Sequence, residues 1–323
     1  THALCVECLC YRARSSFSSV AMSVIAIILA LLLEQWRPLA DRRAWGSLLE
    51  RVAVKLEASF NAGEMRHGAI AWAVGVVPVI ALSLGLYYLL FWFSPILAML
   101  LNVAVLYLTL GFRQFSHYFT GIQLALREDD LDRARRLIGQ WRVEDAAHYT
   151  KEEVIRLAIE EALLASHRHV FAVLFWFMLL PGPMGAIVYR MAGFLARRWR
   201  DQDAFGLFAQ RLHAILEWPA TRCTAIAFAV VGDFEDAVYC WRSQASTWGE
   251  KNIGIILAAG AGALGVRLGM PLGDVLGDAQ ARPDLGVGDA VDAATLDSTV
   301  GLLWRALVVW VFMLLVLTLA RIF

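Results

Sequence analysis

A short polar stretch, His167-Arg168-His169, stands directly before a run of apolar and aromatic residues that ends in Pro181-Gly182-Pro183. Two imidazoles and a guanidinium at such a boundary suit a metal centre, a catalytic pocket or the surface of a membrane. At about 100° per helical residue, the two histidines point about 160° apart, so one regular helix cannot bring both to one metal ion. The chain also has no His-Glu-x-x-His motif. We therefore assign no metal site.

One face of the helix before this stretch gathers the residues that chemistry could use. Arg156, Glu160, Leu163 and His167 fall within a sector of about 60° at helical spacing. The plainest interpretation of Arg156 and Glu160 is an i, i+4 ion pair on a solvated face. A second interpretation is a polar stripe that lines a substrate cleft. For the His-Arg-His stretch the plain interpretation is snorkelling. The polar ends of these side chains would lie in the lipid headgroup layer, and their apolar parts would cover apolar protein surface.

Composition places these residues in a membrane protein. Of the 323 residues, 59% are hydrophobic and 18% are charged, and the mean hydropathy is +0.58. A soluble globular protein carries about 25% charged residues, and one core of this size could not bury so much apolar surface. The net charge is zero. Because no basic block is free of acidic residues, nucleic-acid binding is not supported.

The first 21 residues differ from the rest of the chain. They hold three of the five cysteines, in a spacing that a thiolate metal site could use. They could also form a signal peptide or start anchor, with two arginines ahead of the apolar run. A third interpretation is that translation begins at Met22, where the apolar pattern starts. We favour this third interpretation and treat residues 1–21 as a non-native or disordered leader.

Apolar runs of membrane-spanning length follow. We expect spans near 68–93, 94–112, 170–194 and 300–322. The Pro-Gly-Pro sequence predicts that the third span is kinked or is a re-entrant hairpin. Residues 113–169 are charged and read as a cytosolic helical region. The arginine-rich segment 190–222 favours the re-entrant form, because basic residues prefer the cytoplasmic side.

The sequence thus predicts an all-α fold: a polytopic integral membrane helical protein with cytosolic amphipathic helices and re-entrant segments. We place it in the bacterial inner membrane as a multi-pass protein. The small-residue run AAGAGALG (258–265) should let helices approach closely. The acidic segment 274–297, with six aspartates and one arginine, fits either side of the membrane.

After Met22 the chain resembles the CobD/CbiB superfamily and the related AmpE proteins. The likeness rests on TLGFRQFSHYFTGIQLALREDDLDRARRLIGQW (109–141), IRLAIEEALLASHRHVFAVLFWF (155–177) and NIGIILAAGAGALGVRLGMPL (252–272). A further stretch, AILEWPATRCTAIAFAVVGDFEDAVYCW (214–241), is more similar to AmpE. The resemblance implies a single membrane domain over residues 22–323.

The enzymes of this superfamily make adenosylcobinamide phosphate by forming an amide, and they carry an E-T-V-A-E-N-x-x-D-G signature. The resemblance places its first glutamate at Glu160 and a preceding arginine at Arg156, but its aspartate falls on Arg168. A later arginine is kept as Arg222 and an asparagine as Asn252. Other acidic or amide positions of the family fall on Leu164, Ala165, Gly193, Ala196, His213, Ala214 and Leu257.

From these replaced acids we expect a non-catalytic inner-membrane signalling modulator of the AmpE type, which binds a lipid or an anionic ligand. No catalytic residue, cofactor or metal is assigned. The residual polar site comprises Arg156, Glu160, His167, Arg168, Arg222 and Asn252.

Two alternatives stay open. The first is the amide-forming adenosylcobinamide-phosphate synthase itself, which would use Mg²⁺ and a corrinoid substrate. The second is a lipid- or anion-binding membrane module, with a basic pocket for a phosphate headgroup. As partners we expect membrane lipids and a membrane or cytosolic protein; an oligomer is compatible with the sequence.

Overall fold

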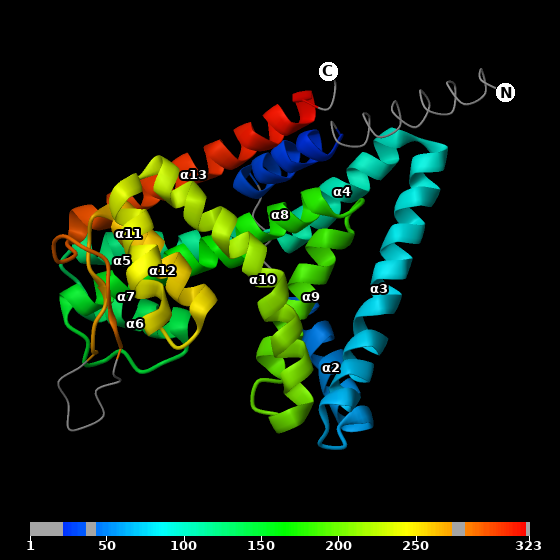
Figure 1. Cartoon of the computed structure of the whole chain (residues 1–323), viewed down its shortest axis with the longest axis horizontal. Coiled ribbons are helices and arrows are strands. Elements are labelled where there is room, and N and C mark those ends of the chain that lie inside the picture. Colours follow the sequence, from blue (N-terminus) through cyan, green and yellow to red (C-terminus); the bar gives the residue numbers. More distant parts are fainter. Residues whose placement is uncertain (1–21, 37–42, 273–281, 321–323) are drawn as a thin grey trace. The chain divides into compact units, whose positions relative to one another are not determined.

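The computed structural model describes residues 22–36, 43–272 and 282–320, and helices make up most of them (Figure 1). The two strands in these ranges, β1 (Leu268–Gly269) and β2 (Asp284–Leu285), form one short antiparallel pair. The all-α fold class predicted from the sequence is confirmed. The predicted leader, residues 1–21, lies outside the described residues.

Four helices in the described part of the chain are long and apolar enough to cross a membrane. They are α3 (Met65–Phe93), the continuous helix of α7 (Lys151–Ser166), η1 (His167–Phe171) and α8 (Ala172–Leu179), α10 (Asp203–Val231), and α13 (Ala293–Ala320). Shorter apolar helices are Met22–Trp36, α4 (Pro95–Thr109) and α12 (Lys251–Leu264). This set of helices is that of a polytopic membrane protein.

The long apolar helices differ from the expected spans in three places, the first being 94–112, where the structure has the shorter apolar helix α4. The helix that contains most of the run after His167 begins at Lys151, inside the segment assigned to the cytosol. Its charged residues led to that assignment, but several of them form buried contacts in the structure. The third difference is α10, which is long and apolar enough to cross a membrane. No span was expected there, because its arginines and acids interrupt the apolar run in the sequence. Burial and tertiary pairing thus decide these boundaries more than local hydropathy does.

The chain divides into two compact units, which are described separately. Unit 1 comprises Thr1–Leu110, Val173–Leu216 and Val311–Phe323, and unit 2 comprises Gly111–Ala172 and Glu217–Trp310. The single domain over residues 22–323 that the resemblance implies stays a prediction.

Unit 1 is built around a small aromatic and aliphatic core. The helices α2 (Arg43–Phe60), α3 and α9 (Met184–Arg198) and the first turns of α10 supply it. Trp199 and Phe205 are fully buried and meet edge to face, with ring centroids 4.9 Å apart. Gly68 on α3 lets the backbone of Phe205 approach so closely that a Cβ atom there would lie 2.0 Å from its carbonyl oxygen.

The Pro-Gly-Pro sequence separates α8 from α9 in unit 1. Helix α8 ends at Leu179, α9 begins at Met184, and Gly182 takes the left-handed φ of +58°. Only glycine adopts this conformation freely, and the ring of Tyr87 lies against it. Gly185 then brings the start of α9 against the backbone of Trp176. The break lies where the sequence predicts one; whether the segment kinks across the membrane or re-enters stays a prediction.

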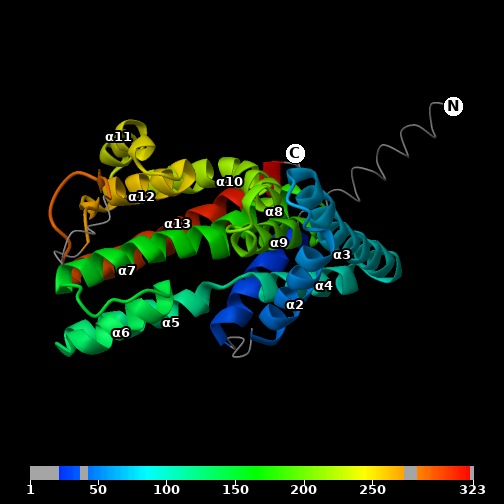
Figure 2. The same ribbon diagram turned by 90° about the horizontal axis from the view of Figure 1, so that it is seen from below.

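Unit 2 places α7 among several helices. The helices α5 (Phe112–Arg127) and α6 (Leu131–Arg142) both contact α7, as does α12, and Figure 2 shows α5 and α6 together along it. Asp130 caps α6, with its carboxylate accepting from the backbone N–H of Arg133. Twelve residues of α7 are buried. This helix is therefore the central element that carries the polar residues of interest.

Small residues let α12 approach its neighbours in unit 2. A Cβ atom at Gly260 would lie 2.6 Å from the side chain of Leu163 on α7. One at Gly262 would lie 2.4 Å from the carbonyl oxygen of Asp236 in α11 (Phe234–Gln244). The run AAGAGALG thus gives the close helix approach that its composition predicts.

We expect Gly262→Ala to lower the free energy of unfolding by about 1–3 kcal/mol, because the added methyl group meets backbone that cannot move aside. Thermal unfolding of the purified protein in detergent measures the change. Gly301→Ala is the matched control, since this helical glycine has nothing within 4 Å of its built Cβ. The close-packing account is contradicted if both variants unfold at the wild-type temperature.

Candidate functional site

The start of α7 is fixed by a reciprocal capping box. The Thr150 hydroxyl accepts a hydrogen bond from the backbone N–H of Glu153 at 3.2 Å, and the Glu153 carboxylate accepts one from the backbone N–H of Thr150 at 2.7 Å. From this fixed start, Arg156 and Glu160 fall on successive turns of one face. They are 4% and 1% exposed, so this face is buried and not solvated.

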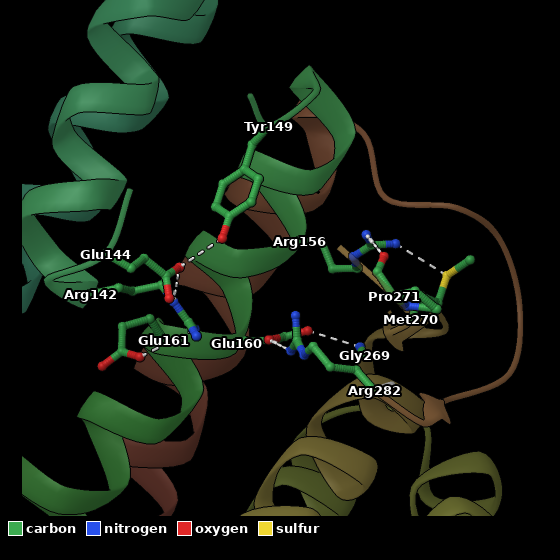
Figure 3. A network of polar contacts seen from close by, with 10 residues as sticks. All are labelled: Arg142, Glu144, Tyr149, Arg156, Glu160, Glu161, Gly269, Met270, Pro271 and Arg282. Atoms are coloured by element: carbon green, nitrogen blue, oxygen red, sulfur yellow. Dashed lines mark hydrogen bonds and ion pairs between the residues drawn. The ribbon is translucent and has the colours of Figure 1, made fainter. Parts of the chain in front are cut away.

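Glu160 ties α7 to the short β1–β2 pair (Figure 3). One carboxylate oxygen accepts a hydrogen bond from the backbone N–H of Gly269 at 2.8 Å. The other forms an ion pair with the guanidinium of Arg282. Arg282 also lies over the ring of Trp248, with 5.2 Å between its guanidinium carbon and the ring centroid. Glu160 is therefore fully engaged by groups on the segment that follows α12.

Arg156, one turn earlier on α7, has much weaker partners. Its guanidinium donates to the Met270 sulfur at 3.2 Å and to the Pro271 carbonyl oxygen at 3.4 Å. The closest carboxylate paired with it, that of Glu152, is 4.0 Å away and half exposed. Its Nε atom is buried and has no hydrogen-bond partner among the described residues. A buried guanidinium thus lacks a close anionic partner in the described part of the chain.

A second ion network lies beside Glu160 on α7. The Arg142 Nε donates to Glu144 at 2.6 Å, and an Nη atom lies 3.9 Å from the carboxylate of Glu161. Burial lowers the pKa of Arg142, but the carboxylates of Glu144 and Glu161 outweigh this effect and raise it above its ordinary value. Burial and the Glu144 carboxylate raise the pKa of Tyr149, whose hydroxyl donates to Glu144. At neutral pH both groups therefore act as hydrogen-bond donors.

His167 lies away from these networks, in the π-helical turn η1. Its two ring nitrogens lie 3.0 Å from the Thr224 hydroxyl and 3.4 Å from the Thr221 hydroxyl. Both threonines belong to α10 and are fully buried, and His167 itself is 2% exposed. His167 therefore packs in the interior of unit 2 and does not snorkel, whereas Arg168 is partly exposed.

The two remaining sequence-predicted residues lie on other helices of unit 2. Arg222 is on α10, where its guanidinium donates to the Trp218 carbonyl oxygen at 2.8 Å and lies 4.0 Å from the centroid of the Trp218 ring. Asn252 is in the first turn of α12. Of the six candidate residues, Arg156 and Glu160 are thus the two that the β1–β2 segment engages together.

Sequence reasoning missed the residues that complete this site. Arg282 is 122 positions from Glu160 in the chain, and no local periodicity links the two. One feature of the sequence could have pointed to Arg282: it is the one arginine in segment 274–297, which has six aspartates. Arg142, Glu144 and Tyr149 belong to a stretch that the sequence indicates only as a charged helical region.

Comparison with known proteins identifies the family. A family model described as CobD/Cbib protein matches residues 21–303. The chain belongs to the CobD/CbiB family. It is 34% identical over 304 residues to the cobalamin biosynthesis protein CobD of Stutzerimonas stutzeri, which covers 92% of this chain and 97% of that protein. It is 33% identical over 295 residues to CobD of Chromobacterium violaceum, covering 88% and 92%. CobD of Mycobacterium tuberculosis is 31% identical over 191 residues, 55% of this chain and 59% of that protein. No solved structure matches.

The CobD relatives correct the function expected from the replaced acids. The non-catalytic AmpE-type signalling modulator is wrong, because proteins similar over nearly the whole chain are cobalamin biosynthesis proteins. The physical reason lies in α7. Leu164 and Ala165 are 8% and 3% exposed, so their apolar character meets a packing requirement. In this CobD/CbiB protein, Arg282 pairs with Glu160 and Arg142 lies near Glu161, and both arginines are distant in sequence from Leu164 and Ala165.

Proposed function

We propose that this protein catalyses the amide-forming step of cobalamin biosynthesis, as an adenosylcobinamide-phosphate synthase. In that reaction the amine of an aminopropanol phosphate forms an amide bond with a corrin carboxylate, and the departing carboxylate oxygen leaves on a phosphate supplied by a nucleoside triphosphate. The observation that carries the proposal is the 34% identity to a cobalamin biosynthesis protein, CobD, over 92% of this chain and 97% of that protein. The family match, over residues 21–303, includes the described elements of unit 2 that hold the polar site.

The site geometry supports a role in holding acidic substrates. Both substrates carry oxyanions, and guanidinium groups bind carboxylate and phosphate with two parallel hydrogen bonds. Arg156 and Arg282 place two such groups against α7, with side chains 5% and 10% exposed. Glu160 is a positioning residue, because it holds Arg282 and the backbone of Gly269 in place. Holding a substrate through such groups orients it for reaction.

The resemblance also implies Mg²⁺, and the residues of this site do not fit a protein-held divalent cation. Among the described residues, no three His, Cys, Asp or Glu side chains lie together as metal ligands. The carboxylate of Glu160 already accepts from Arg282 and Gly269, and the nearby carboxylates of Glu144 and Glu161 are engaged by Arg142. Hard cations need several oxygen ligands from the protein or from the substrate. We therefore derive no step through a metal.

The apolar surface of unit 1 supports a multi-pass location in the bacterial inner membrane. Only 11% of the apolar window of α3 is buried inside the protein. Its outward residues are large and apolar, as at Leu82, which is 75% exposed, and at Trp92, which is 80% exposed. Contiguous apolar surface of this kind is stable against lipid and not against water. Membrane lipids are accordingly the partners that we propose for this surface.

Rescue of a bacterial strain that lacks its own CobD and requires cobinamide tests the proposal. We expect the full chain to restore growth without cobinamide, as the Stutzerimonas stutzeri CobD should in the same vector. Arg133→Met serves as the control variant, since Arg133 is an exposed residue of unit 2 paired with Glu128. Wild-type protein that is present in the membrane fraction and yet fails to rescue, beside a working relative, contradicts the proposed function.

A further inference from the structure

Two buried guanidiniums, those of Arg156 and Arg282, and the buried carboxylate of Glu160 lie where α7 meets the β1–β2 segment of unit 2. Arg282 is paired with Glu160, while Arg156 contacts only a thioether and a carbonyl oxygen at hydrogen-bond distance. The Arg156 Nε and one Arg282 Nη are buried and have no hydrogen-bond partner among the described residues. These three side chains carry a summed charge of +1. Figure 3 shows both arginines on the side of α7 that faces the β1–β2 segment.

Such an arrangement is costly when it stands alone. A buried charge is destabilising unless it is paired and hydrogen-bonded, and a buried N–H without an acceptor also costs free energy. Proteins tolerate such groups where a ligand completes them. Arg156 makes its contacts with Met270 and Pro271, and Glu160 makes its backbone contact with the adjacent Gly269. The unpartnered donors therefore belong to one locality of the fold.

We propose that Arg156 and Arg282 bind the phosphate of the phosphorylated amine substrate. This assignment rests on the proposed function and names the residues that hold one substrate. A phosphate monoester offers three terminal oxygens to two separate guanidiniums, whereas a carboxylate offers two. A phosphorylated amino alcohol has a net charge of about −1 at neutral pH, which balances the +1 summed over Arg156, Arg282 and Glu160. The phosphate does not react, so its binding energy can serve to orient the amine.

Binding measured on the full chain in lipid nanodiscs tests the assignment without turnover. The probes are aminopropanol phosphate, unphosphorylated aminopropanol, inorganic phosphate and acetate. We expect the two phosphates to raise the unfolding temperature of the wild type, while aminopropanol and acetate leave it unchanged. In Arg156→Met, the affinity for aminopropanol phosphate should fall about tenfold or more, because a charge-assisted hydrogen-bond donor is lost. Arg156→Lys should retain part of the affinity.

Stability without ligand separates a binding role from a structural one. We expect Arg156→Met to unfold at or above the wild-type temperature, since it removes a buried charge that has no close carboxylate. Arg133→Met is the matched control and should bind aminopropanol phosphate as the wild type does. A ligand-free loss of stability with unchanged phosphate affinity overturns the assignment, as does equal protection by acetate or binding of none of the probes.

The outcomes also separate this assignment from the proposed function. If the chain rescues the cobinamide-requiring strain and Arg156→Met binds phosphate normally, the assignment fails and the function stands. If phosphate binding depends on Arg156 but neither rescue nor product formation occurs, the function fails and the oxyanion site stands.

Discussion

Glu160→Gln is expected to lower the free energy of unfolding by about 3–5 kcal/mol, which is the usual cost of removing one partner from a buried ion pair. The Glu160 carboxylate is 1% exposed and holds Arg282, whose side chain is 10% exposed. Glutamine keeps an acceptor for the backbone N–H of Gly269 but leaves the Arg282 guanidinium buried without its counter-charge. Denaturant or thermal unfolding in detergent, followed by tryptophan fluorescence, gives the value.

Two further variants show that the loss comes from the unpaired charge. Glu161→Gln is the neighbouring control, and we expect it to cost less than about 1 kcal/mol because Arg142 keeps its contact with Glu144. The double variant Glu160→Gln/Arg282→Met should recover most of the stability, since neutral groups replace both charges. A wild-type stability for Glu160→Gln alone would show that the pair does not hold α7 to the β1–β2 segment.

Gly286→Ala should have a comparably large effect on the same site. Gly286 has a φ of +98°, and a Cβ atom there would lie 2.1 Å from the carbonyl oxygen of Val266. Its backbone N–H and carbonyl are both bonded to the side chain of Gln244, at 2.6 and 3.2 Å. Because the backbone must shift, we expect a loss of stability of about 3 kcal/mol or more and displacement of the segment that carries Arg282.

Gly265→Ala is the control that separates backbone strain from steric conflict. Gly265 also has a left-handed φ, of +67°, but nothing lies within 4 Å of its built Cβ. Its substitution should cost about 1–2 kcal/mol, the penalty for a side chain in this conformation. Thermal unfolding and aminopropanol-phosphate binding are measured on both variants. Equal losses in the two would contradict the steric account of the Val266 contact.

The membrane class and the helical architecture were predictable because they depend on composition and local pattern. The long apolar run of α3 and the helix break at Pro181-Gly182-Pro183 are visible in the sequence. The common face of Arg156 and Glu160 was also predictable, since it follows from helical geometry alone. These features require no knowledge of what a helix packs against.

The partners of that face were not predictable, because they depend on long-range contacts. The Gly269 and Arg282 groups that engage Glu160 are more than 100 residues from it in the chain. Without these two partners, the sequence suggested a solvated Arg156–Glu160 ion pair. The apolar Leu164 and Ala165, at positions where the family has polar residues, suggested that catalytic activity was lost. The structure shows that α7 is buried on most sides, so both patterns have a packing origin.

The central claim is that this chain forms the amide of cobalamin biosynthesis. Its most direct test supplies the full chain in nanodiscs with a corrin carboxylate, aminopropanol phosphate and a nucleoside triphosphate to activate the departing oxygen, and follows the corrinoid product by mass spectrometry. We predict a product whose mass equals the sum of the two substrates less one water, with at least a tenfold lower rate for Arg156→Met at limiting aminopropanol phosphate. Folded wild-type protein that yields no such product, while the Stutzerimonas stutzeri CobD does, would contradict the account.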